Sequence, residues 1–182
     1  MGDTRGALFL ITDHRPDPAA IADLACAFGI EVNNGYVMNR NILGRERPIV
    51  FGRGRDRLSD HLITRGRRRA EKVASIATFT GSAFRAGQSF QPLMILAPGR
   101  RSWTPCELGE FPPDTPKMSV DGWFQGAVAT IEKGRIAVFS EAAMFTAQIF
   151  DRGRVGFGMN HPQAEDNAQF LLNVMHWLSG LL

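Results

Sequence analysis

The sequence lacks the motifs of several common enzyme classes. It has no G-x-x-x-x-G-K-[ST] loop and no G-x-G-x-x-G turn after its first predicted strand, which argues against a nucleotide cofactor. No G-x-S-x-G elbow follows a strand, so no serine nucleophile is evident. The cysteines, Cys26 and Cys106, form neither a disulfide framework nor a zinc spacing.

Long hydrophobic runs are missing as well. No apolar run reaches the roughly 18 residues that a membrane helix needs, and no apolar leader with a small-residue cleavage site opens the sequence. We therefore expect no membrane span and a cytoplasmic location. The 182 residues are 44% hydrophobic and 21% charged, which favours one globular domain over residues 1–182.

Basic residues are unevenly placed along the chain, although the net charge is only +3. Ten arginines against three acids lie between Arg40 and Arg69, and the single aromatic residue of this stretch is Phe51. Without further aromatic rings the stretch offers no platform on which bases could stack. We interpret it as a salt-bridged or solvated loop face, and nucleic acid as a disfavoured partner.

The hydrophobic pattern predicts strands that alternate with helices. The predicted strands are 6–12, 30–32, 71–80, 92–96 and the hairpin 126–131/135–139, and the predicted helices are 19–28, 142–150 and 163–178. Residues 98–121, rich in proline, are predicted to form a long connecting segment without a helix or strand. This order predicts an α/β fold, flavodoxin-like and doubly wound, with a mainly parallel sheet, helices on both faces and an antiparallel edge hairpin.

Polar residues that could bind a ligand or take part in catalysis follow the predicted strands. Asp13 and His14 follow the first strand, Glu141 follows the strand 135–139, and Asn160 and His161 precede the last helix. In open α/β sheets such strand ends form the ligand site. Each residue also has a structural interpretation, because carboxylates cap loops and helix starts.

The predicted site divides into three roles. The predicted catalytic residues are Asp13, His14, Glu141 and His161, and the predicted substrate-binding residues are Ser82, Gln148, Asn160 and Asn167. Asp13, His14 and Glu141 are also candidate ligands of a divalent metal such as calcium or zinc.

Several segments resemble one uncharacterised branch of the class I glutamine amidotransferase-like superfamily. They are Asp13-His14 after the first strand, Ala27-Phe28-Gly29, Asn34-Gly35, 61–66, 78–81, 134–143 and 167–178. The resemblance implies a flavodoxin-like fold for most of the chain. It does not imply amidotransferase activity, because the G-x-C-x-G elbow of that reaction is missing. Relatives of this branch have more chain before the first strand, so we expect an uncovered sheet edge that a homodimer or another partner would cover.

Two functions follow as hypotheses. The first is a small-molecule hydrolase for an ester, lactone or amide bond, with water as nucleophile and assistance from a metal. The alternative is a non-catalytic ligand-binding or protein-interaction module of the same fold, in which the segment from Arg40 to Arg69 contacts an anionic partner.

Overall fold

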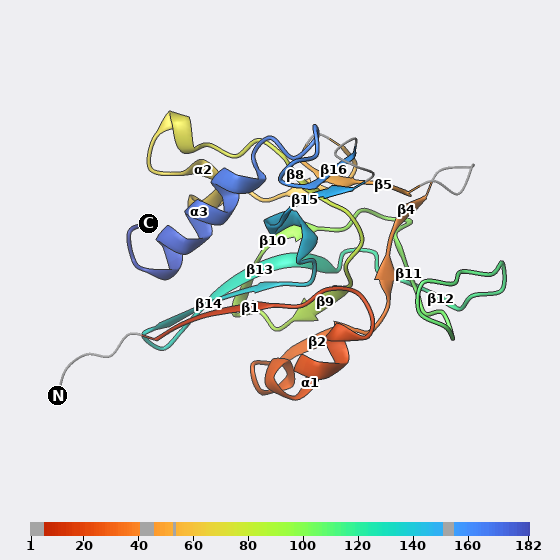
Figure 1. Ribbon diagram of the computed structural model, residues 1–182. Helices are drawn as coiled ribbons and strands as arrows, with labels where there is room; N and C mark the ends of the chain where they lie inside the picture. The colour runs from red at the N-terminus through yellow and green to blue at the C-terminus, as the bar shows by residue number, and fades with distance from the viewer. Residues whose placement is uncertain (1–5, 41–45, 53, 151–154) are drawn as a thin grey trace.

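A curled sheet with mostly antiparallel strands lies at the centre of the computed structural model, which describes residues 6–40, 46–52, 54–150 and 155–182 (Figure 1). Its seven strands are β1 (Ala7–Ile11), β2 (Ile30–Asn33), β7 (Arg57–Leu58), β9 (Ala83–Ala86), β10 (Phe90–Ile95), β13 (Phe124–Ile131) and β14 (Gly134–Phe139). The path β1-β14-β13-β10-β7 forms the sheet, and β9 joins β2 to β13. Among the named strands described, β1 and β14 make the one parallel pair.

Smaller sheets and short helices surround this sheet. The sheets are β3 (Tyr36–Val37) with β11 (Arg101–Trp103) and β12 (Lys117–Ser119), β4 (Asn39–Arg40) with β5 (Glu46–Arg47), β6 (Ile49–Phe51) with β8 (Ile76–Thr78), and β15 (Ala147–Phe150) with β16 (Val155–Gly158). The α-helices are α1 (Asp17–Ala27), α2 (Leu62–Arg65) and α3 (Asn167–Leu178), and the 3-10 helices are η1 (Arg69–Glu71) and η2 (Ala143–Phe145).

Hydrophobic cores lie on both faces of the main sheet. On one face, Phe170 and Val174 of α3 pack with Phe139 of β14. On the other face, Ala25 of α1 packs with Leu10 and other buried residues of the sheet. Because side chains alternate along a strand, β1 contributes to both cores, with Phe9 and Ile11 on the α3 face and Leu8 and Leu10 on the α1 face.

Several elements agree with the sequence predictions. The strand 6–12, the helix near 19–28 and the final helix are present as β1, α1 and α3. The hairpin is confirmed in register, since Gly126 pairs with Phe139 and Ile131 pairs with Gly134. The predicted connecting segment 98–121 contains two short strands, β11 and β12.

The predicted doubly wound, mainly parallel fold is wrong. Parallel neighbours need crossover connections of a dozen or more residues, usually helical. Between β2 and β13 the described chain offers only α2, of four residues, and η1, of three residues. The strands therefore return through turns and loops and pair antiparallel.

The predicted helix 142–150 is also wrong. The chain makes one 3-10 turn at η2 and continues as β15, which pairs with β16. Ile149 and Phe150 belong to the residue types that favour strands. Only residues Ala143–Phe145 of the predicted helix adopt a helical turn, the 3-10 helix η2.

The expectation of no membrane span can be compared with the helices of the structure. In the part of the chain that the structure describes, every helix is too short or too polar to cross a bilayer.

Candidate functional site

The parallel pair β1–β14 brings together two of the polar segments singled out in the sequence. Asp13 and His14 follow β1, and Glu141 follows β14. Both strands end at the same edge because they run in the same direction in register from Ala7–Arg135 to Ile11–Phe139. Burial raises the pKa of Asp13, and a hydrogen bond from the backbone amide of Ala142 opposes that shift; burial also raises the pKa of Glu141, and the charge of Asp13 adds to it.

Glu141 is the most perturbed acid of this cluster. Its side chain is fully buried, and its Oε2 accepts a hydrogen bond of 2.8 Å from the Met144 amide. Among the described residues, its Oε1 has no hydrogen-bond partner. Burial, with a smaller contribution from the charge of Asp13, raises the pKa of Glu141 to about 8. Glu141 is therefore mostly protonated and neutral at pH 7.

Asp13 and His14 form the outer part of the cluster. Burial raises the pKa of Asp13, and a hydrogen bond of 2.8 Å from the backbone amide of His14 to Asp13 Oδ1 opposes this shift. The His14 ring stacks on Tyr36 with 4.4 Å between centroids, and its Nδ1 lies 2.8 Å from the Arg15 carbonyl oxygen. These contacts fix the imidazole against β3.

Neighbouring residues enclose the side chain of Glu141 within this cluster. Gly81, at a φ of +77°, packs directly on the Cβ and Cγ atoms of Glu141, where any larger residue would collide. Since Glu141 is fully buried, bulk solvent and a substrate do not reach its carboxyl group in this conformation. Among the described residues, no group of three His, Cys, Asp or Glu side chains is placed to hold a metal ion. The arrangement therefore does not supply the expected three-residue metal site of Asp13, His14 and Glu141.

Two predicted substrate-binding residues lie in the protein interior. Ser82 is fully buried, and its hydroxyl lies 3.4 Å from the Ser140 carbonyl oxygen. Asn167 is fully buried, accepts a bond of 3.0 Å from the Ala77 amide, and donates to the carbonyl oxygens of Ala77 and Met144 at 2.8 and 3.0 Å. These bonds join α3 to β8 and η2.

The remaining predicted residues lie at the β15–β16 hairpin. Gln148 donates to Thr146 Oγ1 at 2.7 Å, and Asn160 donates to the Gln148 carbonyl oxygen at 3.3 Å. The His161 ring lies edge-on to Phe79 at 5.3 Å, and burial lowers the pKa of His161. No contact between these residues and Asp13 or His14 is recorded in the described part of the chain.

A different feature marks the opposite margin of β1. In the described structure β1 pairs with β14 on one side and with no strand on the other. The hydrogen bonds from Arg135 N to Gly6 O and from Thr12 N to Phe139 O show which residues of β1 direct their backbone N–H and C=O groups to β14. Even-numbered residues of β1 therefore direct their peptide groups to β14, and Ala7, Phe9 and Ile11 direct theirs outward.

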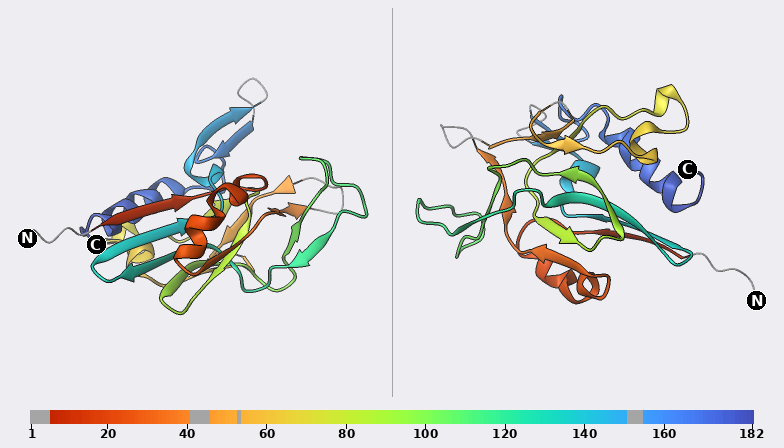
Figure 2. Two further views of the ribbon diagram at one scale, coloured as in Figure 1. Left: turned by 90° about the horizontal axis from the view of Figure 1, so that it is seen from below. Right: turned by 180° about the vertical axis from the view of Figure 1, so that it is seen from behind.

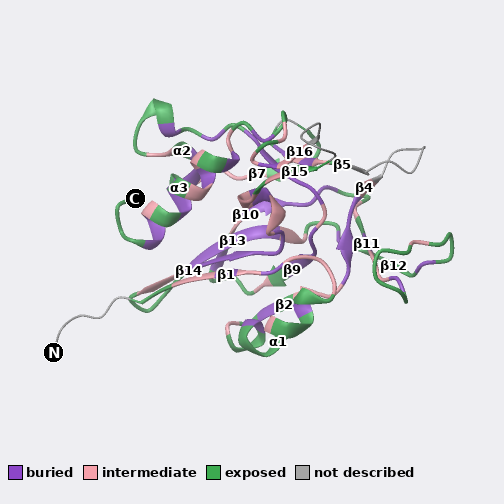
Figure 3. Ribbon diagram, in the orientation of Figure 1, coloured by how far each residue is buried: buried purple, intermediate pink, exposed green. Residues whose placement is uncertain are grey.

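Helix α3 presents apolar side chains beside this free edge. Leu172 and Met175 are 53% and 48% exposed, and Leu171 is partly exposed. At about 100° per residue, Leu171 and Met175 lie opposite Asn173 on the helix. Asn173 faces α2 and η1, so the Leu171/Met175 flank faces away from them, and α3 also contacts β1. Figure 2 (left) shows α3 along β1 with α2 on the far side, and Figure 3 shows the exposed outer residues of α3.

The β15–β16 hairpin stands out from the body on the same side (Figure 2, left). Ile149 is 63% exposed and Phe150 is 52% exposed, although successive strand residues point to opposite faces. Both side chains are exposed at this end of the hairpin, while Phe157, on the same face as Phe150, packs on Phe79. We call the free edge of β1, the α3 side chains Leu171, Leu172 and Met175, and the hairpin side chains Ile149 and Phe150 the β1-edge surface.

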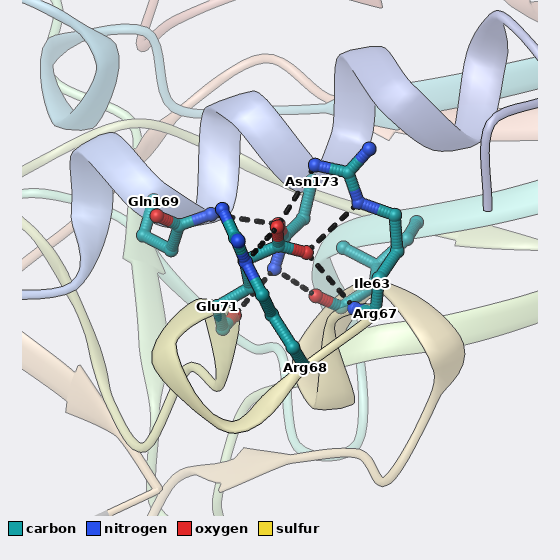
Figure 4. Close-up of polar contacts among 6 residues, drawn as sticks. All are labelled: Ile63, Arg67, Arg68, Glu71, Gln169 and Asn173. Atoms are coloured by element: carbon teal, nitrogen blue, oxygen red, sulfur yellow. Dashed lines mark hydrogen bonds and ion pairs between the residues drawn. The ribbon is translucent and has the colours of Figure 1, made fainter.

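A buried polar cluster fixes α3 from its other flank (Figure 4). Asn173 donates to the carbonyl oxygens of Ile63 and Glu71 at 2.7 and 2.8 Å. Glu71 binds Arg67 Nη2 at 2.8 Å and Arg68 Nε at 3.1 Å. The side-chain hydrogen bond from Arg67 lowers the pKa of Glu71 to about 2. The cluster thereby holds α3 in one position above β1.

Three arginines of the arginine-rich segment form ion pairs with nearby acids. Arg65 pairs with Asp60 at 2.6 Å, and Arg67 and Arg68 pair with Glu71. The prediction of a salt-bridged loop face is confirmed for these arginines. Arg45 and Arg53, which also belong to the segment, lie outside the described residues.

The chain matches no family model and no curated protein. It is similar to a solved structure, the mmIFT52 N-terminal domain, a domain of an intraflagellar transport protein. The TM-score is 0.57 at 15% sequence identity, over 96% of this chain and 65% of that one. The chain thus spans slightly less than two thirds of the domain it matches, and the similarity shows a shared fold.

The structure and this similarity correct two interpretations of the sequence. The expected glutamine amidotransferase-like fold is wrong, because the shared fold is a strand-rich half-barrel. The segments on which that resemblance rested, such as 78–81 and 134–143, are short strands and turns that many folds contain. The hydrolase interpretation, with its ester, lactone and metal variants, is wrong as well, because it rested on the strand ends of a doubly wound sheet that the chain does not have, and the carboxyl group of Glu141 is closed off from solvent.

Proposed function

We propose that this chain is a non-catalytic protein-interaction module that binds protein partners through the β1-edge surface. The observation that carries the proposal is that the edge of β1 that no described strand covers, helix α3 and the β15–β16 hairpin lie on one side of the molecule, and that α3 and the hairpin carry exposed apolar residues. Exposed apolar side chains gathered on one side of a protein are typical of protein–protein contact sites.

The helix α3 supports the proposal through its composition. It contains no Asp, Glu, Lys or Arg in its 12 residues, whereas 21% of the chain is charged. The central parts of protein interfaces are depleted in charged residues in the same way. The hairpin adds Phe150, an aromatic residue of the kind that interface centres favour.

A matched pair of variants tests this proposal. Leu172→Glu with Met175→Glu places charge on the proposed surface, and Leu24→Glu places it on α1, where the leucine is 48% exposed. Purified variants would be cross-linked in a lysate of the source cells, and partner proteins identified by mass spectrometry. We expect the α3 double variant to recover partner at least about tenfold less than wild type, equivalent to about 1.4 kcal/mol.

The α1 variant should recover the same partner as wild type. Circular dichroism and thermal unfolding would verify that each variant keeps its fold. If the α3 double variant recovers as much partner as wild type, partners do not bind through the β1-edge surface.

A further inference from the structure

The free edge of β1 lacks the features that keep edge strands apart. Its sequence, Ala7-Leu-Phe-Leu-Ile11, contains no charge and no proline, and its register with β14 runs without a bulge. Natural proteins commonly protect exposed edges with lysine, proline, bulges or a covering segment. An unprotected apolar edge is suited to pairing with another strand.

If two β1 strands pair antiparallel about a two-fold axis, the outward backbone N–H and C=O groups of both edges form hydrogen bonds. A two-fold axis through Phe9 places Phe9 opposite Phe9 of the second copy, and Ala7 opposite Ile11 of the second copy. All of these residues direct their peptide groups outward, so each facing pair exchanges two N–H···O=C bonds. The axis is perpendicular to the sheet, so the α3 faces of both copies lie on the same side.

The side chains also fit this register. Ala7 is small and exposed. Ile11 of the second copy would lie next to Ala7 on the same face, because residues opposite each other in an antiparallel pair share a face. The small residue at one end of the edge thus makes room for the large residue at the other end.

The flank of α3 distinguishes a second copy from an isolated extended peptide. A single added strand would cover the β1 edge and leave Leu172 and Met175 exposed. A second copy carries its own α3 at the same height above its own β1, so the two flanks meet across the axis. Neither helix carries an Asp, Glu, Lys or Arg, so no like charges oppose this contact.

We propose that the occupant of the β1-edge surface is a second copy of this chain, paired through antiparallel β1 strands and through the uncharged flanks of α3. This inference rests on the proposed function, because it names the partner that the interaction surface takes. Such a dimer has the isologous interface that is commonest among protein oligomers.

Sedimentation velocity of the purified chain over a range of micromolar concentrations tests the inference. We expect wild type to convert from a 20.1 kDa monomer to a species of about twice that mass as concentration rises. Leu172→Glu with Met175→Glu should raise the dissociation constant at least about tenfold, and Leu24→Glu should leave it unchanged.

A backbone variant supplies an independent check. Ala7→Pro removes an outward N–H at the first residue of β1 and keeps the bonds to β14, a position where edge strands tolerate proline. We expect it to weaken the dimer and to leave monomer unfolding close to wild type. A monomeric wild type at every concentration would overturn the inference, as would equal weakening by Leu24→Glu.

The result also separates the two proposals. If wild type stays monomeric but the α3 double variant loses its lysate partner, the interaction function stands and the second copy is the wrong occupant. If the α3 double variant changes neither the dimer nor partner recovery, the β1-edge surface itself is wrong.

Discussion

Asn167→Ala is expected to lower the free energy of unfolding by about 3 to 5 kcal/mol. The amide of Asn167 makes three buried bonds, to the backbone N–H and carbonyl of Ala77 and to the carbonyl of Met144. Alanine leaves these groups without partners, and each unsatisfied buried group costs roughly 1 to 3 kcal/mol. The loss would loosen α3 and with it one part of the β1-edge surface.

Asn160→Ala is the matched control for this substitution. Asn160 is exposed and makes one hydrogen bond of 3.3 Å. We expect its removal to change the unfolding free energy by no more than about 0.5 kcal/mol. Urea unfolding followed by tryptophan fluorescence measures both variants. Equal effects of the two substitutions would show that the buried Asn167 bonds do not hold α3.

Glu141 is expected to make the protein less stable as the pH rises. Its folded pKa, about 8, exceeds its ordinary value of 4.5 because the carboxyl group is buried. The folded state therefore holds this proton more tightly than the unfolded state. The resulting stability is fully present below pH 4.5 and is lost as the pH rises through 8, on the order of a few kcal/mol in all.

Glu141→Gln isolates this contribution. Glutamine stays neutral and keeps an oxygen that can accept the Met144 amide bond. The variant should resemble wild type near pH 5 and exceed its stability near pH 9. Glu110→Gln, an exposed acid, should follow the wild-type curve. Parallel curves for Glu141→Gln and wild type from pH 5 to 9 would contradict the buried, neutral Glu141.

Some local elements, such as β1, α1 and α3, were predictable from the sequence, but the helix predicted over 142–150 and the pairing of the strands were not. The apolar run of β1, the glycine after α1 and the period of α3 determine these elements locally. Whether β2 pairs with β1 or with β9 depends on contacts between distant residues. The apolar run that suggested a central parallel strand belongs to an edge strand that two cores cover.

The candidate site was predictable only in part, for the same reason. The approach of Asp13 to Glu141 follows from the rule on strand ends, because β1 and β14 are parallel neighbours. The burial of Glu141 depends on Gly81, which arrives from another part of the chain. The exposed Leu172 and Met175 had one sequence signal, the absence of charge from the last helix, but their exposure required the packing of α3.

Amide hydrogen exchange within β1 tests the central claim most directly. Leu8 and Leu10 donate to β14, whereas the N–H groups of Phe9 and Ile11 point to the free edge. We expect Phe9 and Ile11 to exchange rapidly in dilute protein and to become as protected as Leu8 and Leu10 when the partner copy binds. Rapid exchange at Phe9 and Ile11 in a sample that sediments as a dimer would contradict pairing through β1.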